Sequence, residues 1–338
     1  ITFMDRTIQP EIQPLKNFHI QTPVRTTLPN GIPLTVINAG EQEVVRMDVL
    51  FSGGRWQQSQ KLQALFTNRM LREGTTKYTA ATIAEKLDYY TITPEVLREF
   101  YERYYHSGSC SIFLSGKVTD DIISRVTDIF GIPFGQYQLQ MPKSSFPFAA
   151  IPEKRIFTER EDAMQSAVKM GCTTITREHP DYPKLRVLMT LFGGYFGSRL
   201  MSNIREDKGY TYGISAGVVF YPDSGLLIVS TETDNEYVEP LIQEVYHEID
   251  RLHLDPVSAE ELRIVRNYML GEMCRSYESP FSLSDAWIFI ATSGLKDDYF
   301  ARSLQAVNEI TPAEIQDLAQ RYLCKETLKE VIAGKKLS

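Results

Sequence analysis

The sequence predicts an α+β protein built from two related halves. Strand and helix patterns alternate along the chain, and one helix–strand unit occurs twice: residues 92–117 align without a gap to residues 310–335. In each copy a Thr precedes a Pro, the usual start of a helix, and a polar turn leads into an apolar strand that ends at Gly. Agreement over this length is not expected by chance, so the two halves are related.

The elements follow in order. "GIPLTVI" and "EVVRMDVLF" are rich in β-branched residues and predict two strands, the first after an Asn-Gly turn. Apolar residues at helical spacing predict helices over 62–72 and 81–87, before the first copy of the repeated unit. Turn formers without periodicity predict a linker at 136–154, which separates a first half (1–135) from a second half (155–338).

Composition limits the classes of function. The 338 residues carry a net charge of −7 and 43% hydrophobic residues, as in a globular protein of about two domains. No block of Lys and Arg is present to neutralise phosphates, so a nucleic-acid partner is not predicted. No apolar run reaches the roughly 18 residues of a membrane span. The first residues lack the apolar core of a signal peptide, although a cleaved segment before Ile1 stays open.

Cysteines and histidines do not form metal motifs. Four cysteines lie far apart: Cys110, Cys172, Cys274 and Cys324. They are expected to be buried free thiols, which favours a reducing compartment such as the cytoplasm. The two closest histidines, His247 and His253, are six residues apart and do not share a face of the predicted helix.

Several short motifs resemble one known family. "LPNGIPLTVI", "SGGRW", "RMLREGT" and "LFGGYFGSRLMSNIREDKGYTYGISA" are similar to segments of the pitrilysin and mitochondrial processing peptidase family of zinc peptidases. The resemblance covers most of the chain and is strongest in the second half. It implies two similar halves, each a mainly antiparallel sheet packed with helices, that face each other around a chamber.

The family's zinc helix carries H-x-x-E-H, in which two His bind zinc and the Glu acts as general base. The resemblance places these positions on Leu65, Asn68 and Arg69. Leu has no donor atom, Asn cannot take a proton at neutral pH, and Arg stays cationic. We therefore expect no metal in this chain.

A second family feature is an Arg followed seven residues later by a Tyr, and here "REDKGYTY" supplies Arg205 and Tyr212. Both can donate hydrogen bonds to the oxyanion that a peptide carbonyl becomes in the transition state. We expect Arg205 at the end of a helix and Tyr212 on the next strand, with Tyr210 on the same face as a rival. The alternative is a solvated Arg and a packed Tyr.

The stretch "FGGYFGSRL" resembles, in shortened form, a glycine-rich loop that contacts substrate in the non-catalytic processing-peptidase subunit. The resemblance makes Gly193, Gly194 and Gly197 candidates for substrate binding. The alternative is that these glycines allow close packing at a helix N-terminus.

The two halves differ in length. The repeated unit recurs at an offset of 218 residues, whereas family alignment pairs Leu87 with Ile204 at an offset of 117. The second half therefore holds 101 residues that the first half lacks. We expect about 100 residues to be absent after Tyr90, so that Thr91 is not its neighbour in the complete chain. The family's third zinc ligand, a Glu, would lie in that segment.

The resemblance implies a zinc-less subunit of a two-chain zinc peptidase, which would give its Arg and Tyr to a paralogous, zinc-bearing partner acting on peptides. A non-catalytic scaffold or peptide-binding protein of the same fold is the alternative. "GISAG" fits the G-x-S-x-G motif of serine hydrolases, but its flanks are strand-like and no helix is predicted after it, so this third hypothesis is not favoured.

Overall fold

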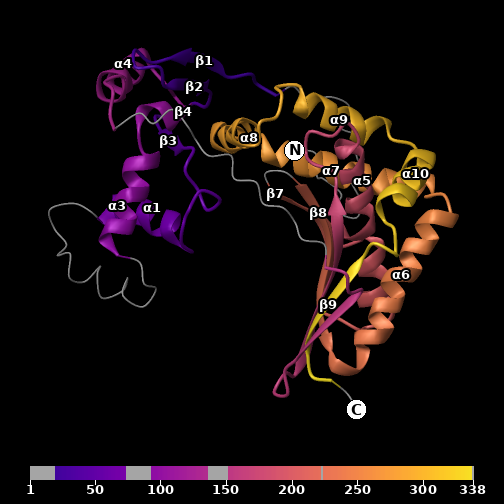
Figure 1. Ribbon diagram of the computed structural model, residues 1–338. Helices are drawn as coiled ribbons and strands as arrows, with labels where there is room; N and C mark the ends of the chain where they lie inside the picture. Colours follow the sequence, from indigo (N-terminus) through magenta and orange to yellow (C-terminus); the bar gives the residue numbers. More distant parts are fainter. Residues whose placement is uncertain (1–19, 74–92, 136–150, 222–223, 337–338) are drawn as a thin grey trace, which may run out of the picture. The chain divides into compact units, whose positions relative to one another are not determined.

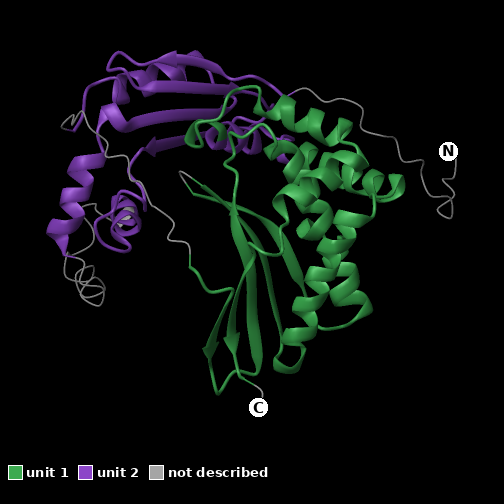
Figure 2. Ribbon diagram, turned by 45° about the vertical axis from the view of Figure 1, so that its right-hand side comes forward, with its two compact units in different colours: residues 1–19, 147–275, 290–338 green, residues 20–146, 276–289 purple. Residues whose placement is uncertain are grey.

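A computed structural model describes residues 20–73, 93–135, 151–221 and 224–336. The chain divides into two compact units, shown in Figure 2. Unit 1 contains Pro147–Arg275, Ile290–Ser338 and the first 19 residues, and unit 2 contains Ile20–Phe146 and Ser276–Phe289. The predicted boundaries of the halves and of the linker stay predictions. The predicted break after Tyr90 and the predicted helix 81–87 lie outside the described residues.

Unit 2 is built on a four-stranded sheet of order β1-β2-β4-β3. The elements are β1 (Val24–Thr27), β2 (Pro33–Asn38), β3 (Val45–Phe51), α1 (Gln63–Glu73), α3 (Pro94–Tyr104), β4 (Cys110–Gly116) and α4 (Asp120–Phe130). The β2–β4 pair is parallel and the other two pairs are antiparallel. Helix α4 packs its apolar face on the core residues of β2 and β4, while α1 and α3 pack against each other.

Unit 1 is built on a five-stranded sheet of order β5-β9-β6-β8-β7, whose helices lie on one face (Figure 1). Its strands are β5 (Arg155–Glu159), β6 (Gln165–Thr174), β7 (Ile214–Tyr221), β8 (Ser224–Asp234) and β9 (Lys329–Gly334). Its helical segments are α5 (Tyr182–Met189), η3 (Thr190–Gly194), η4 (Met201–Asp207), α6 (Val238–Leu254), α7 (Ala259–Ser276), α9 (Tyr299–Glu309) and α10 (Pro312–Tyr322).

Helix α8 (Pro280–Thr292) contributes its first ten residues to unit 2 and its last three to unit 1. Within unit 2, the Asp285 carboxylate forms an ion pair with the Arg46 guanidinium, with 2.6 Å between oxygen and nitrogen. The indole nitrogen of Trp287 donates to the carbonyl oxygen of Gln21 at 3.0 Å. These contacts attach α8 to β3 and to the segment before β1.

The predicted repeat is confirmed. Each copy forms a helix and a strand, α3–β4 and α10–β9. Thr93 and Thr311 are the N-caps, each accepting a hydrogen bond from the backbone three residues later, and Pro follows each of them. The strand order β2-β4-β3 matches β5-β9-β6, with the same parallel and antiparallel pairs. The α+β class with mainly antiparallel sheets is therefore confirmed.

No helix in the described part of the chain is both long and apolar enough to cross a membrane. All four cysteines are free thiols; Cys110 and Cys172 are buried, whereas Cys274 and Cys324 are partly exposed. The prediction of free thiols is confirmed, but burial holds for only two of them.

Candidate functional site

Helix α1 keeps its packing face but has no metal ligands. Leu65, Asn68 and Arg69 are exposed, and the Asn68 amide is hydrogen-bonded to the Tyr105 hydroxyl. On the opposite side the buried Gln63 amide donates to the carbonyl oxygen of Val96 in α3 at 2.7 Å. These side chains cannot hold zinc. Among all described residues, no group of three or more His, Cys, Asp or Glu is placed to bind a metal ion.

Arg205 lies in the last turn of η4, as predicted. Its guanidinium carbon is 4.4 Å from the ring centroid of Phe196, whose side chain is 63% exposed. This cation–π contact orients the guanidinium but uses none of its N–H donors. No ion pair or hydrogen bond of Arg205 occurs within the described residues, so its donors face no acceptor of the protein there.

Tyr212 lies in a bend before β7, and the predicted placement on a strand is wrong by two residues. The reason is local. The Thr211 hydroxyl donates to the carbonyl oxygen of Glu232 at 2.6 Å and bonds Gly213, which holds the chain away from the ladder that starts at Ile214. The Tyr212 side chain is 92% exposed and makes no hydrogen bond within the described residues.

Tyr210, the other candidate for the oxyanion donor, is held by contacts within the protein. Its ring stacks on Tyr237 with centroids 4.9 Å apart. Its backbone N–H donates to Ile204 at 3.0 Å, and its carbonyl accepts from the Thr233 hydroxyl at 2.5 Å. Gly209 makes this turn possible because it adopts a φ of 68°. The segment between Arg205 and Tyr212 is thus fixed to β8 by its backbone. No hydrogen bond joins the two candidate side chains.

The three candidate glycines differ in their surroundings. Gly193 is buried at the end of η3, where an added Cβ would lie 2.6 Å from the Cβ of Ala216 in β7. The absence of a side chain at Gly193 is therefore needed for close packing, which agrees with the packing alternative to substrate binding. The packing occurs at the end of a helical segment and not at a helix N-terminus. Gly194 and Gly197 are exposed, and a Cβ at Gly197 would lie 3.0 Å from the ring of Tyr195.

A polar pocket of about 470 Å³ lies beside Gly197, between η4 and helices α6 and α7. One of its lining residues, Glu248, is completely buried and accepts hydrogen bonds from Asn203 at 2.8 Å and Arg251 at 2.9 Å. Arg199 forms a bidentate pair with Glu261 at 2.7 and 2.9 Å. The sequence analysis did not predict this network, because an acidic residue on a helix is normally solvated.

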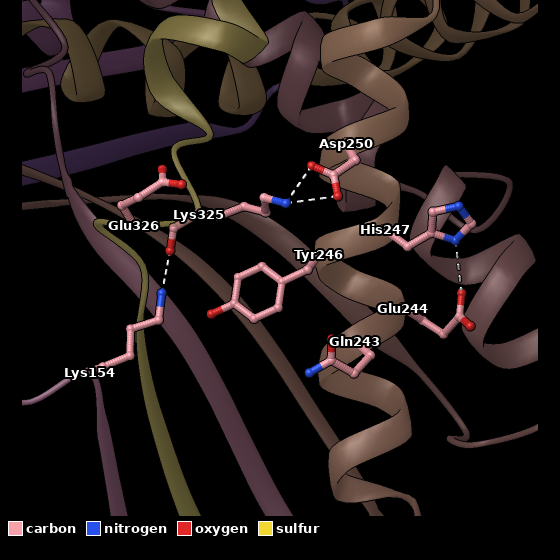
Figure 3. Close-up of a pocket in the computed structure, with 8 residues that line it drawn as sticks. All are labelled: Lys154, Gln243, Glu244, Tyr246, His247, Asp250, Lys325 and Glu326. Atoms are coloured by element: carbon pink, nitrogen blue, oxygen red, sulfur yellow. Dashed lines mark hydrogen bonds and ion pairs between the residues drawn. The ribbon is translucent and has the colours of Figure 1, made fainter.

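A second pocket, of about 630 Å³, lies along α6 near the end of the predicted linker (Figure 3). The Tyr246 hydroxyl donates to the buried Glu330 carboxylate at 2.5 Å, and burial together with this bond raises the pKa of Tyr246. Lys325 pairs with Asp250 at 2.6 Å, and the Lys154 ammonium donates to the carbonyl oxygen of Lys325. Since these groups bond one another, we interpret the pocket as a structural contact between α6 and the segment before β9.

Residues 91–269, slightly more than half of the chain, match the family model of the "Peptidase M16 inactive domain". The chain belongs to the peptidase M16 family. The match confirms the predicted family and assigns the chain to an inactive domain of it. The G-x-S-x-G alternative has no structural support, because this segment runs into β7, which pairs with β8.

Over the aligned segments, curated relatives are about one quarter identical to this chain. It is 25% identical to the uncharacterized zinc protease YmxG of Bacillus subtilis over 183 residues, which are 54% of this chain and 44% of YmxG. It is 22% identical to the probable inactive metalloprotease YmfF of the same species over 195 residues, 57% of this chain and 45% of YmfF. The chain spans about half the length of the curated relatives it matches.

Solved M16 structures share the fold. The peptidase M16 inactive domain of Pseudomonas fluorescens matches with a TM-score of 0.80 at 17% identity, over 94% of this chain and 99% of that one. The first half of the periplasmic protease PqqL of Escherichia coli matches with a TM-score of 0.70 at 12% identity, over 93% of this chain and 92% of that one.

Proposed function

We propose that this chain is the zinc-less subunit of a two-chain zinc peptidase and supplies Arg205 and Tyr212 to the site of a zinc-bearing paralogue. One observation carries the proposal. Hydrogen bonds fix the backbone of the segment that carries both side chains. Neither side chain donates a hydrogen bond to a described group of the protein. A fixed backbone places the two side chains, and donors that are free of internal acceptors can serve an oxyanion of a bound substrate.

The exposure of Tyr212 supports a role outside the folded chain. Tyr side chains usually contribute to stability by burying their ring, but the Tyr212 ring is 92% exposed and gains little from folding. The ring of Phe196 is also largely exposed and lies under the Arg205 guanidinium. Two largely exposed aromatic side chains, one of them under a cation, are better explained by contact with a ligand or partner than by packing within this chain.

The chemistry assigned to this chain is hydrogen bonding. The Tyr212 hydroxyl would donate to the oxygen of the scissile carbonyl as it gains negative charge. The Arg205 guanidinium, with five N–H donors, would hold a neighbouring carbonyl or the carboxylate of a peptide. The partner's metal would activate the water, since Leu65, Asn68 and Arg69 exclude a zinc site on α1.

The proposal is tested by mixing this chain with H-x-x-E-H-bearing M16 proteins encoded in the same genome. We expect one such protein to form a 1:1 complex that holds one zinc per pair and cleaves peptides, while this chain alone does not. If no zinc-bearing relative binds at micromolar concentration, or if peptidase activity is the same with and without this chain, the proposal is wrong.

A peptide-binding scaffold is the second candidate, and the exposed aromatic residues Phe196 and Tyr212 favour it as well. A scaffold would bind peptides without a zinc-bearing partner. Fluorescence titration of the isolated chain with unstructured peptides separates the two. Saturable binding that depends on both rings, with no partner found, would support the scaffold.

A further inference from the structure

The hydroxyl of Thr211 is the centre of a small hydrogen-bond cluster at the point where β7 begins. It donates to the carbonyl oxygen of Glu232 at 2.6 Å and accepts from the N–H of Gly213 at 3.1 Å. The hydroxyl of Thr231 in β8 lies 2.9 Å from that of Thr211 and donates to the carbonyl oxygen of Gly213 at 2.9 Å. Each hydroxyl thus uses its single proton once. We call Thr211 and Thr231 the threonine clip; it satisfies both backbone groups of Gly213 with side chains and not with a neighbouring strand.

The point at which β7 begins determines where the Tyr212 ring lies. Strand β7 pairs with β8 from Ile214 onward, and the side chains of Ile214 and Ala216 are buried on the face that the helices cover (Figure 1). Residues two apart in a strand share a face of the sheet. A strand that began at Tyr212 would therefore place its ring on the buried face beside Ile214. The chain bends at Tyr212 instead, and the ring is 92% exposed.

The bond between Thr211 and Gly213 competes with the strand. A Thr hydroxyl that bonds the backbone two residues later offers that backbone an alternative to a ladder. Residue preferences alone favour the ladder here, because β-branched and aromatic residues such as Thr and Tyr are common in strands. On the other side of the bend, the Thr233 hydroxyl donates to the carbonyl oxygen of Tyr210 at 2.5 Å. Tyr212 is therefore held between two anchored residues, Tyr210 and Gly213.

We propose that Thr211 is the positioning residue of Tyr212: through the threonine clip it ends the sheet before Tyr212 and keeps the ring outside the fold, where a substrate can reach its hydroxyl. Without the clip, the Gly213 N–H would lose its acceptor, and residues 211–213 would move or join the ladder. A misplacement of about 1 Å in a catalytic group can lower a rate about 100-fold, so Thr211 would affect the reaction through Tyr212 without touching the substrate. The catalytic part rests on the proposed function, whereas the position of Tyr212 can be tested in this chain alone.

Amide exchange of this chain tests the clip. Thr211→Val removes the hydroxyl but keeps the branched shape, and Thr211→Ser keeps the hydroxyl. The Gly213 amide should exchange about 10-fold faster in Thr211→Val, because it loses its acceptor, and at the original rate in Thr211→Ser. Stronger protection of Gly213 together with slower nitration of the Tyr212 ring would show that the ladder has extended over the bend, and this also supports the clip. Any other result in Thr211→Val overturns the proposal.

Peptide cleavage by the complex with the zinc-bearing partner tests the catalytic part. Thr211→Val should lower kcat about 10- to 100-fold and leave KM within about twofold, and Thr211→Ser should restore kcat. In a Tyr212→Phe background the same change should lower kcat by less than about twofold further, because Thr211 acts through the Tyr212 hydroxyl. Thr127→Val on α4 is the matched control. Its hydroxyl also donates to a backbone carbonyl, that of Ile123 at 2.8 Å, and its loss should leave both constants unchanged.

The outcomes separate this inference from the proposed function. If Tyr212→Phe lowers kcat but Thr211→Val does not, the clip is only structural, and the positioning role is wrong while the proposed function stands. An equal loss from Thr211→Val with and without the Tyr212 hydroxyl also overturns the positioning role, because Thr211 would then act by another route. If neither variant lowers kcat, the proposed function itself is wrong, and the positioning role fails with it.

Discussion

Tyr212→Phe is the most direct test of the proposed role of this chain, because it removes a single hydroxyl group. That hydroxyl has no described partner and its ring is 92% exposed. The free energy of unfolding should therefore change by no more than about 0.5 kcal/mol, as for ordinary surface substitutions. Complex formation with the zinc-bearing partner should persist for the same reason.

The expected effect on catalysis is large. Loss of one fixed oxyanion donor costs about 10²–10³ in kcat, or about 2.7–4 kcal/mol. KM should change little, because the donor acts mainly in the transition state. Arg205→Ala should raise KM as well, since the guanidinium can hold a carbonyl or carboxylate of the substrate. This difference between the two variants separates an oxyanion donor from a substrate clamp.

The assay is steady-state peptide cleavage by the mixed complex, with thermal unfolding followed in parallel. Tyr210→Phe is the matched control: it is the same change two residues away, on a ring that stacks against Tyr237, and it should alter kcat by less than about twofold. If Tyr212→Phe also keeps kcat within about twofold while the complex forms, Tyr212 is not an oxyanion donor and the scaffold becomes the better explanation.

Four further outcomes follow from the structure. Gly193→Ala should destabilise the fold by about 1–3 kcal/mol in urea unfolding, because its Cβ would meet Ala216, whereas Gly194→Ala, with no contact under 3.2 Å, should cost less. Thr311→Ala should cost about 1 kcal/mol through loss of its N-cap, and an unchanged midpoint would contradict the capping role. Hydrogen bonds from Tyr322 and Arg321 lower the pKa of Asp181 below its ordinary 3.8, so its stabilisation is present above about pH 4 and lost as pH falls further; Asp181→Asn should flatten this part of the stability profile. Elemental analysis of the purified chain should find far less than one zinc per molecule, and a stoichiometric metal would show that a ligand set has been overlooked.

Local sequence signals predicted those elements that local chemistry decides. The Thr-Pro starts of α3 and α10 and the Gly ends of β4 and β9 were predicted from the repeat, and the helix expected over 62–72 is α1, Gln63–Glu73. These features depend on caps, turns and periodicity, which a single sequence displays. The matching strand order of the two sheets, which the sequence analysis did not predict, agrees with the repeat, because related units fold alike.

Contacts between distant residues could not be predicted in this way. Tyr212 follows an alternating pattern that reads as a strand, but Thr211 bonds the carbonyl of Glu232, 21 residues away, and delays the strand to Ile214. The burial of Glu248 could not be predicted either, because an acidic residue on a helix is normally solvated. Only its pairing with Asn203 and Arg251 makes burial tolerable, and neither contact has a signature in the sequence.

The contacts that hold helix α1 in place lie on its buried side. Its buried side holds Gln63, bonded to α3, and Thr67, whose hydroxyl donates to the carbonyl of Gln63 at 2.9 Å. Its exposed side holds Leu65, Asn68 and Arg69, the positions to which the family resemblance would assign metal ligands and a general base. Since the two sets lie on different faces, substitutions at the exposed positions leave the contacts of α1 with α3 in place. The Gln63 hydrogen bond and apolar packing hold the helix against α3, and neither needs a metal ion.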